Sequence, residues 1–236
     1  VNISMNHIAA HYSAFQNDKT LFKDNDLVKL DIGVHINGSV GDNSITIDLG
    51  NNKDLVDACT KALNEALKIA KPGTEVRHIG QVIQQSIQEF NLAPIRNLSG
   101  HSIKEYDLHA GLTIPNYDNN DRTKLEEDMI IAIEPFATNG EGKVIEGRGS
   151  DIYKLKEKKN VRNESARKVL NEIEKYNGLP FAKRWINIAM KDLAFNILER
   201  ENILYQYSQL IETSRGLVSQ AEHTLIVGKC ITTRLT

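Results

Sequence analysis

Cysteine is almost absent from this sequence, which holds only Cys59 and Cys230. The two lie far apart in the chain, so they form neither the closely spaced pairs of a thiolate metal site nor a framework of disulfides. A secreted domain stabilised by disulfides is therefore excluded, and the composition favours a protein of the reducing cytoplasm.

Long apolar runs are missing as well. No stretch reaches the roughly 20 apolar residues that span a bilayer, and no signal peptide is visible. The net charge of −2 excludes a chain drawn by its overall charge to nucleic acid or to an anionic membrane. What is there, 236 residues of which 40% are hydrophobic, suits one large globular domain. The chain starts at Val1 instead of methionine, so we expect its original start to be missing.

Residues 28–47 predict a β-hairpin. Two runs of β-forming residues flank Asn37-Gly38, the strongest short-range signal for a tight turn. Counting outward from this turn pairs Gly33 with Asp42. Because side chains alternate between the faces of a strand, Asp31 and Asp42 then share one face, about 7–8 Å apart, and Gly33 leaves space between them.

The two faces of this hairpin predict different environments. One face is apolar and is expected to belong to the core; it carries Leu30, Ile32, Val34, Ile45 and Ile47. The other face carries two carboxylates, which repel each other unless a cation lies between them. From the hairpin alone, a pair of solvent-exposed aspartates and a metal site are equally compatible with the pattern.

Two further strands each contain a single acid. Glu134 interrupts the apolar run 129–137, and Glu222 lies within the strand-forming run 216–227. A carboxylate inside a buried strand is costly unless it is paired or bound to a metal. An acid that has reached solvent at a strand end or edge is the alternative for both.

Three histidines accompany these acids. His101 stands in a glycine-punctuated region, His109 follows eight residues later, and His11 precedes the hairpin. From its own stretch alone, His11 is better explained as a packed histidine. His101 and His109 are weak signals by themselves, because a neutral histidine often only satisfies its hydrogen bonds.

Taken together, four carboxylates and one imidazole on neighbouring strands would be electrostatically untenable without cations. Two divalent metal ions would neutralise them. Ligation mainly by oxygen with one nitrogen favours Mn²⁺, Fe²⁺, Co²⁺ or Zn²⁺, and such a pair of metals suits hydrolysis of an amide bond. The candidate metal ligands are Asp31, Asp42, His101, Glu134 and Glu222.

The order of these residues resembles the methionine aminopeptidase family. The matching motifs are Asp31 with Asp42 eleven residues later, Gly100-His101, Glu134-Pro135-Phe136 and Gln220-Ala221-Glu222-His223. The segment Ala9-Ala10-His11-Tyr12 resembles the one that carries the family's substrate-side histidine. The stretch 100–111 and the long insertion between Glu134 and Glu222 resemble the type II branch, its archaeal members most of all. The resemblance covers nearly the whole chain.

This resemblance implies an α+β pita-bread fold, the fold of creatinase and these aminopeptidases, in which helices cover a curved antiparallel sheet. The catalytic domain would comprise residues 1–146 and 212–236. Residues 147–211 would form an inserted helical subdomain. The family's first helix and strand would be absent, so the chain is expected to be a shortened form at its N-terminus.

The resemblance also implies a role for each site residue. Asp31 would bind one metal, His101 and Glu134 the other, and Asp42 and Glu222 would bridge the two. Glu134 would transfer the proton, His109 would stabilise the tetrahedral intermediate, and His11 would contact the substrate near the scissile amide. The residues that would line the methionine pocket are Leu108, His109, Phe136 and Tyr207. Ala221, where the family often has an aromatic residue, would face away from the metals.

The implied enzyme is a monomer that removes the N-terminal methionine from nascent proteins with a small second residue. Residues 154–184 hold ten Lys or Arg against four Glu, a balance of +6. This run is typical of a solvated face, with a contact to RNA or the ribosome as the second interpretation. A proline dipeptidase of the same fold, with the same five ligands, and a non-catalytic binding protein are the alternative functions.

Overall fold

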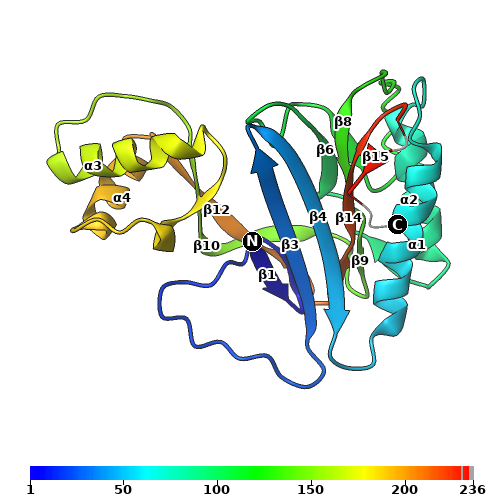
Figure 1. Ribbon diagram of the computed structural model, residues 1–236. Helices are drawn as coiled ribbons and strands as arrows, with labels where there is room; N and C mark the ends of the chain where they lie inside the picture. The colour runs from blue at the N-terminus through cyan, green and yellow to red at the C-terminus, as the bar shows by residue number, and fades with distance from the viewer. Residues whose placement is uncertain (230, 234–236) are drawn as a thin grey trace.

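The computed structural model describes residues 1–229 and 231–233, so Cys230 lies outside the described residues (Figure 1). Within them, the largest sheet has eight antiparallel strands in the order β1-β3-β4-β14-β8-β6-β7, with β15 beside β14. These strands are β1 (Asn2–Met5), β3 (Leu27–Ile36), β4 (Ser39–Asp48), β6 (Ser99–Ile103), β7 (Thr113–Pro115), β8 (Ile130–Ile133), β14 (Glu222–Ile226) and β15 (Ile231–Thr232). None of the helices in this part of the chain is long and apolar enough to cross a membrane.

The β3–β4 hairpin has the predicted register. Gly33 pairs with Asp42 and Asp31 pairs with Ser44. Asn37 and Gly38 both adopt positive φ, 49° and 88°, as a tight hairpin turn requires. The two aspartates therefore project from one face of the sheet, as the alternation predicts.

Helices α1 (Lys53–Ile69) and α2 (Val76–Gln88) cover the opposite face of the sheet over β14, β8 and β7. Their apolar residues recur with helical spacing, so each buries one side against the strands. Ile131, Ile133 and Leu225 point from the strands into this core. Ala221 lies in the same core, which confirms that it faces away from the acidic face.

The prediction of a core on the apolar face of the hairpin is wrong. Val34, Ile45 and Ile47 are 64%, 50% and 43% exposed, and Leu30 and Ile32 are only half-buried. The reason is that α1 and α2 lie mainly over the other end of the sheet, and α1 contacts β4 without covering this face of the hairpin (Figure 1). Alternation along a strand places residues on one face but does not bring a partner to that face.

Both acid-bearing runs are broken where a single strand was expected. The chain passes from β8 to β9 (Phe136–Thr138) through Glu134 and Pro135, and from β13 (Val218–Gln220) to β14 at Ala221. Strands β9 and β13 pair with each other, together with β5 (Ala93–Pro94), in a second small sheet. Glu134 and Glu222 thus stand where the chain changes from one sheet to the other.

A separate lobe extends on the far side of the sheet from α1 and α2 (Figure 1). Strands β10 (Val144–Leu155) and β12 (Leu204–Glu212) lead into it and pair with β2 (Ile8–Ala10) and β11 (Phe181–Ala182). The lobe holds α3 (Glu164–Ile173), α4 (Lys191–Arg200) and two short 3₁₀ helices, Glu174–Tyr176 and Lys183–Trp185. Its own hydrophobic core includes Tyr153, Phe181 and Phe195.

Candidate metal centre

Three of the five candidate ligands form a tight, buried group. Possible ligand atoms of Asp42, His101 and Glu222 all lie within 4.8 Å of one another. Each comes from a different strand of the large sheet, β4, β6 and β14, and all three side chains are buried. Because β14 pairs with both β4 and β8, residues far apart in the sequence meet on one face.

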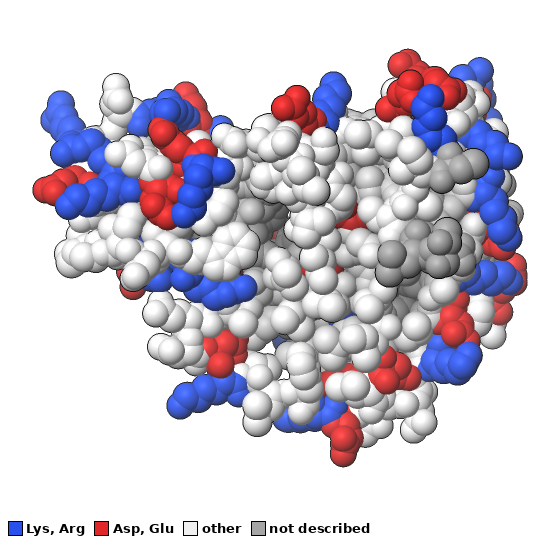
Figure 2. Space-filling view, in the orientation of Figure 1, with Lys and Arg blue, Asp and Glu red and all other residues white. Residues whose placement is uncertain are grey.

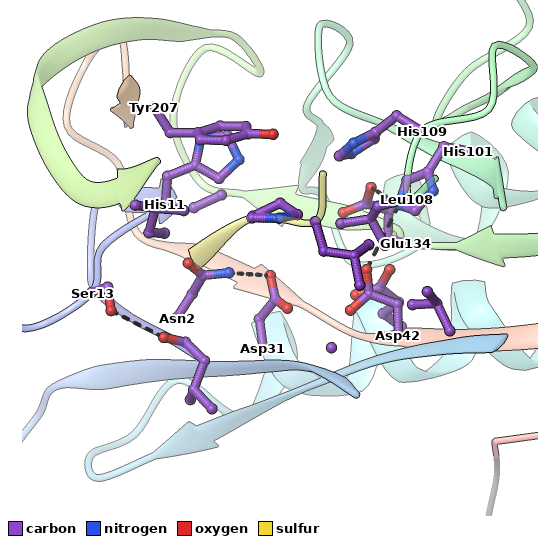
Figure 3. Close-up of a pocket in the computed structure, with 18 of the residues that line it drawn as sticks. Asn2, His11, Ser13, Asp31, Asp42, His101, Leu108, His109, Glu134 and Tyr207 are labelled. Atoms are coloured by element: carbon purple, nitrogen blue, oxygen red, sulfur yellow. Dashed lines mark hydrogen bonds and ion pairs between the residues drawn. The ribbon is translucent and has the colours of Figure 1, made fainter. Parts of the chain in front are cut away.

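Glu134 and Asp31 flank this group (Figure 3). Nε2 of His101 lies 3.8 Å from Oδ2 of Asp42 and 3.8 Å from Oε1 of Glu134. Oε2 of Glu134 accepts a hydrogen bond of 3.3 Å from Nε2 of Gln220. The Asn2 amide donates to Oδ2 of Asp31 at 3.1 Å.

Burial shifts the pKa of every ionisable group in this cluster toward its neutral form. The pKa of Asp42 rises to about 7, first because the carboxyl is buried and then because Asp31 is close. Burial, followed by repulsion from neighbouring acids, also raises the pKa values of Glu134 and Glu222 well above the usual range. Burial lowers the pKa of His101 to about 4, and His109 adds to the shift. The ionised forms of these buried carboxylates are therefore unfavourable unless a cation among them offsets their charge.

The residues fit a divalent metal ion. Oε1 of Glu222 is fully buried and accepts no hydrogen bond from the residues that the structure describes. Such an orphaned oxygen is costly unless another partner occupies its lone pairs. Several carboxylates and one imidazole are the donor set of Mn²⁺, Fe²⁺, Co²⁺ and Zn²⁺. The backbone of Asp42 is held in turn by Thr224, whose hydroxyl accepts from the Asp42 amide at 2.8 Å and donates to its carbonyl at 2.9 Å.

The ten site residues that the sequence singles out all line one cavity of about 550 Å³. On one side of it, His101 and His109 lie with ring centroids 4.4 Å apart. On the other side, His11 contacts Tyr207 edge to face at 5.1 Å (Figure 3). The remaining six are Asp31, Asp42, Leu108, Glu134, Phe136 and Glu222.

His11 is held in an unusual conformation. Its φ is +65°, in the left-handed region that a residue with a Cβ seldom adopts. Its Nδ1 lies 3.1 Å from the carbonyl oxygen of Ser208. A carbonyl only accepts hydrogen bonds, so Nδ1 carries the proton, and burial lowers the pKa of the ring and keeps it neutral. Nε2 is thereby left as an acceptor.

Several residues around the site were not predicted from the sequence. Asn2 orients Asp31, and Gln220 orients Glu134. Neither pairing could be predicted without knowing which strands are neighbours. The lobe also supplies an aromatic wall to the cavity, including Tyr176 and Trp185. The only tryptophan in the chain was a signal that could have drawn attention to this wall.

Comparison with known proteins agrees with this geometry. Residues 1–169 match metallopeptidase family M24. The methionine aminopeptidase of Archaeoglobus fulgidus is 46% identical over 237 residues, which cover 99% of this chain and 81% of that protein. The methionine aminopeptidase of Methanocaldococcus jannaschii is 44% identical over 229 residues, 96% of this chain and 78% of that protein.

Solved structures show the same fold. A thermophilic Arx1 superposes with a TM-score of 0.83 at 17% identity, covering 99% of this chain and 73% of that chain. A methionine aminopeptidase from Thermotoga maritima superposes with a TM-score of 0.64 at 20% identity, covering 96% of this chain and 69% of that chain. The expected α+β pita-bread fold is confirmed. Because identities of 44–46% extend over nearly the whole sequence, the chain belongs to the methionine aminopeptidases of metallopeptidase family M24, which use divalent metal ions to remove N-terminal methionine.

Proposed function

We propose that this protein removes methionine from nascent chains with a small second residue, and that it uses two divalent metal ions. The observation that carries the proposal is the convergence of four acids and one histidine on one wall of a cavity whose other walls are largely apolar. The ions would be Co²⁺, Mn²⁺, Fe²⁺ or Zn²⁺, all of which accept this donor set. The site would work in the cytoplasm, where nascent chains are made.

Asp31 would hold one ion, His101 and Glu134 the other, with Asp42 and Glu222 shared between them. The ions supply two things when bound: polarisation of the scissile carbonyl and a lower pKa for attacking water. The raised pKa values of Asp42, Glu134 and Glu222 support this assignment, because a divalent cation offsets the cost of burying their charges.

Two side chains are placed to handle protons and charge. Glu134 would take the proton of the attacking water and pass it to the leaving amine. Burial raises its pKa, which suits a carboxyl that must alternate between its two forms. His109 would donate a hydrogen bond to the oxyanion of the tetrahedral intermediate. Burial lowers the pKa of His109, so it can make this bond as a neutral imidazole.

His11 would orient the substrate from the opposite wall. Its Nδ1 donates to the Ser208 carbonyl, so the free Nε2 can accept a hydrogen bond from the scissile amide N–H. Leu108, Phe136 and Tyr207 would enclose the methionine side chain. An apolar pocket of limited size suits an unbranched thioether.

We further propose that residues 147–211 form a subdomain inserted into a catalytic domain of residues 1–146 and 212–236. The separate core of the lobe around Phe181 and Phe195 supports this division. The subdomain would shape the far wall of the cavity, because Tyr176 and Trp185 belong to the subdomain and line that wall.

A ribosome contact through the basic run 154–184 is less well supported. Five of its lysines form ion pairs: Lys158 with Glu174, Lys159 with Glu157, Lys168 with Glu164, Lys175 with Glu172 and Lys183 with Asp192. Blue and red side chains accordingly alternate over the lobe in Figure 2. Interleaved charges of this kind favour a solvated face over a surface for RNA.

The test is release of free methionine from the peptide Met-Ala-Ser, with metal-free protein titrated by Mn²⁺ and by Co²⁺. We expect release only with metal. A parallel assay with an Xaa-Pro dipeptide separates the proline dipeptidase alternative, since cleavage of that substrate alone would overturn the proposal. Absence of both metal binding and release would favour a non-catalytic binding protein.

A further inference from the structure

The cavity extends beyond the residues assigned to methionine. Its volume of about 550 Å³ lies in the range that encloses a ligand of several residues rather than one side chain. In Figure 2 the surface is hollowed between the lobe and the sheet. The lobe contributes a wall without a charged side chain, made by Tyr176, Leu179, Pro180, Phe181, Ala182 and Trp185.

Trp185 is the exposed member of an otherwise packed aromatic group. Tyr176 stacks on Phe181, with ring planes 4° apart and centroids 5.1 Å apart, and Phe181 is buried in the lobe core. The Trp185 ring lies 5.9 Å from Tyr176, yet 48% of the residue is exposed. A large aromatic side chain that is supported from below and exposed above offers an apolar surface to a partner.

The backbone beside Trp185 is fixed to the wall that carries His11. Nη1 of Arg184 donates to the Ser13 hydroxyl at 2.8 Å and to the Ala14 carbonyl at 2.7 Å. The same nitrogen lies 3.1 Å from Oδ2 of the buried Asp151, which also accepts from the Arg184 amide. Arg184 thus joins the lobe to the segment just after His11. A surface held this way loses little freedom when a ligand binds.

We infer that Trp185 and Tyr176 form a shelf for the substrate residues that follow the second one, with a preference for apolar or aromatic side chains at the third position. The inference rests on the proposed function, because a chain cleaved after its first residue must leave the site through the rest of the same cavity. The continuity of the shelf with the metal centre identifies the occupant as the substrate itself. The lack of charge on the wall sets the preference.

The single tryptophan allows a direct binding test. Trp185 is the only one in the chain, so emission excited at the indole band reports on the shelf alone. Protein loaded with Mn²⁺ would be titrated with Met-Ala-Phe-Ser and Met-Ala-Gly-Ser whose first peptide bond is reduced to CH₂–NH and cannot be hydrolysed. We expect the Phe peptide to change the emission and to bind about three- to tenfold more tightly, as one aromatic contact would give. Equal affinities with unchanged emission would overturn the inference.

A kinetic test uses the cleavable forms of both peptides. The ratio of their kcat/KM values should favour Phe about three- to tenfold in the native enzyme and fall to about one in Trp185→Ala. Leu193→Ala is the matched control, an exposed apolar residue of the same lobe that does not line the cavity, and it should keep the native ratio. A native ratio retained in Trp185→Ala would refute the shelf.

The two tests also separate the shelf from the chemistry. If no peptide, including Met-Ala amide, releases methionine while the Phe peptide still changes the emission, the proposed function fails and the shelf stands. If all three release methionine and the third residue has no effect on rate or emission, the function stands and the shelf fails.

Discussion

One face of the large sheet is buried at one end and exposed to solvent at the other. Over β14 and β8 it is sealed by α1 and α2, and Ile131 is fully buried. Over β3 and β4 the same face continues with Ile45 and Ile47, which are about half exposed. The residue types are alike at both ends, so the difference comes from what packs on them and not from the strands themselves.

The other face of the sheet joins these two ends. Asp42 comes from the uncovered end, His101 and Glu222 come from the covered end, and they meet in one buried cluster. The polar face of the hairpin is therefore the buried one and its apolar face is the exposed one. The hairpin therefore inverts the usual pattern, because its acidic face is the one that packs against the rest of the molecule.

The largest effect is expected for the two acids that the opposite ends of the sheet contribute to the cluster, Asp42 and Glu222. Asp42→Asn and Glu222→Gln should each lower methionine release at least about 100-fold and weaken metal binding, because each removes a charge that offsets the metals. Metal titration calorimetry and the peptide assay measure the two effects. The exposed Glu126→Gln serves as a control and should change neither. If only one of these two variants lost activity and metal binding, the metal site would depend on one end of the sheet only.

The next largest effect is expected in the free energy of unfolding, when two isoleucines on the same face of the sheet are replaced. Ile131→Ala should lower the free energy of unfolding by about 2–5 kcal/mol, because it leaves a cavity under the helices. Ile45→Ala should cost less than about 1 kcal/mol, since half of that residue is already in solvent. Urea denaturation measures both. Similar costs would show that something covers the hairpin face in solution.

The third prediction concerns pH and the metal-free protein. The pKa of Asp42 is raised to about 7 in the fold, so the folded state binds this proton more tightly than the unfolded chain does. The resulting stability is complete below the unfolded pKa near 4 and is lost as the pH rises through about 7. Relative to Asp42→Asn, the native metal-free protein should lose roughly 2–4 kcal/mol over this window. A difference that grows in favour of the native protein would contradict the sign.

The smallest effect is expected at Gly33, beside the acids on the hairpin. An added Cβ would lie 3.5 Å from Oδ1 of Asp42, an ordinary contact, so Gly33→Ala should change stability by less than about 1 kcal/mol. Its counterpart at the covered end is Gly100, where a Cβ would come within 2.2 Å of the Ala132 carbonyl oxygen. Gly100→Ala should therefore disturb β6 and the adjacent His101, as thermal unfolding and metal titration would report. If Gly100→Ala changed stability and metal binding as little as Gly33→Ala, the backbone around Gly100 must be able to shift to accommodate a Cβ.

Prediction from the sequence succeeded where local signals fix the geometry. Asn37-Gly38 sets the turn, and the turn alone determines that Asp31 and Asp42 share a face. It failed where the answer depends on distant packing. Alternation could not show that the apolar face of the hairpin stays bare, because no local signal says where α1 and α2 will lie.

The breaks in the acid-bearing strands were equally hidden. Pro135 marks a change after Glu134, but the run 216–227 contains no comparable signal before Glu222. Which sheet a strand joins depends on its neighbours and not on its own residues. The same limit applies to the cavity wall, where Trp185 lines the same cavity as His11, which lies near the start of the chain.

The strict pairing along β3 and β4 limits how this region can change in length. Ten residue pairs run without a bulge from the turn to the far end of the hairpin. Deleting or inserting one residue between Asp31 and the turn would rotate the strand by one position and send that carboxylate to the outer face. Insertions and deletions that survive selection here are therefore expected in twos, so that related sequences should differ in hairpin length by even numbers.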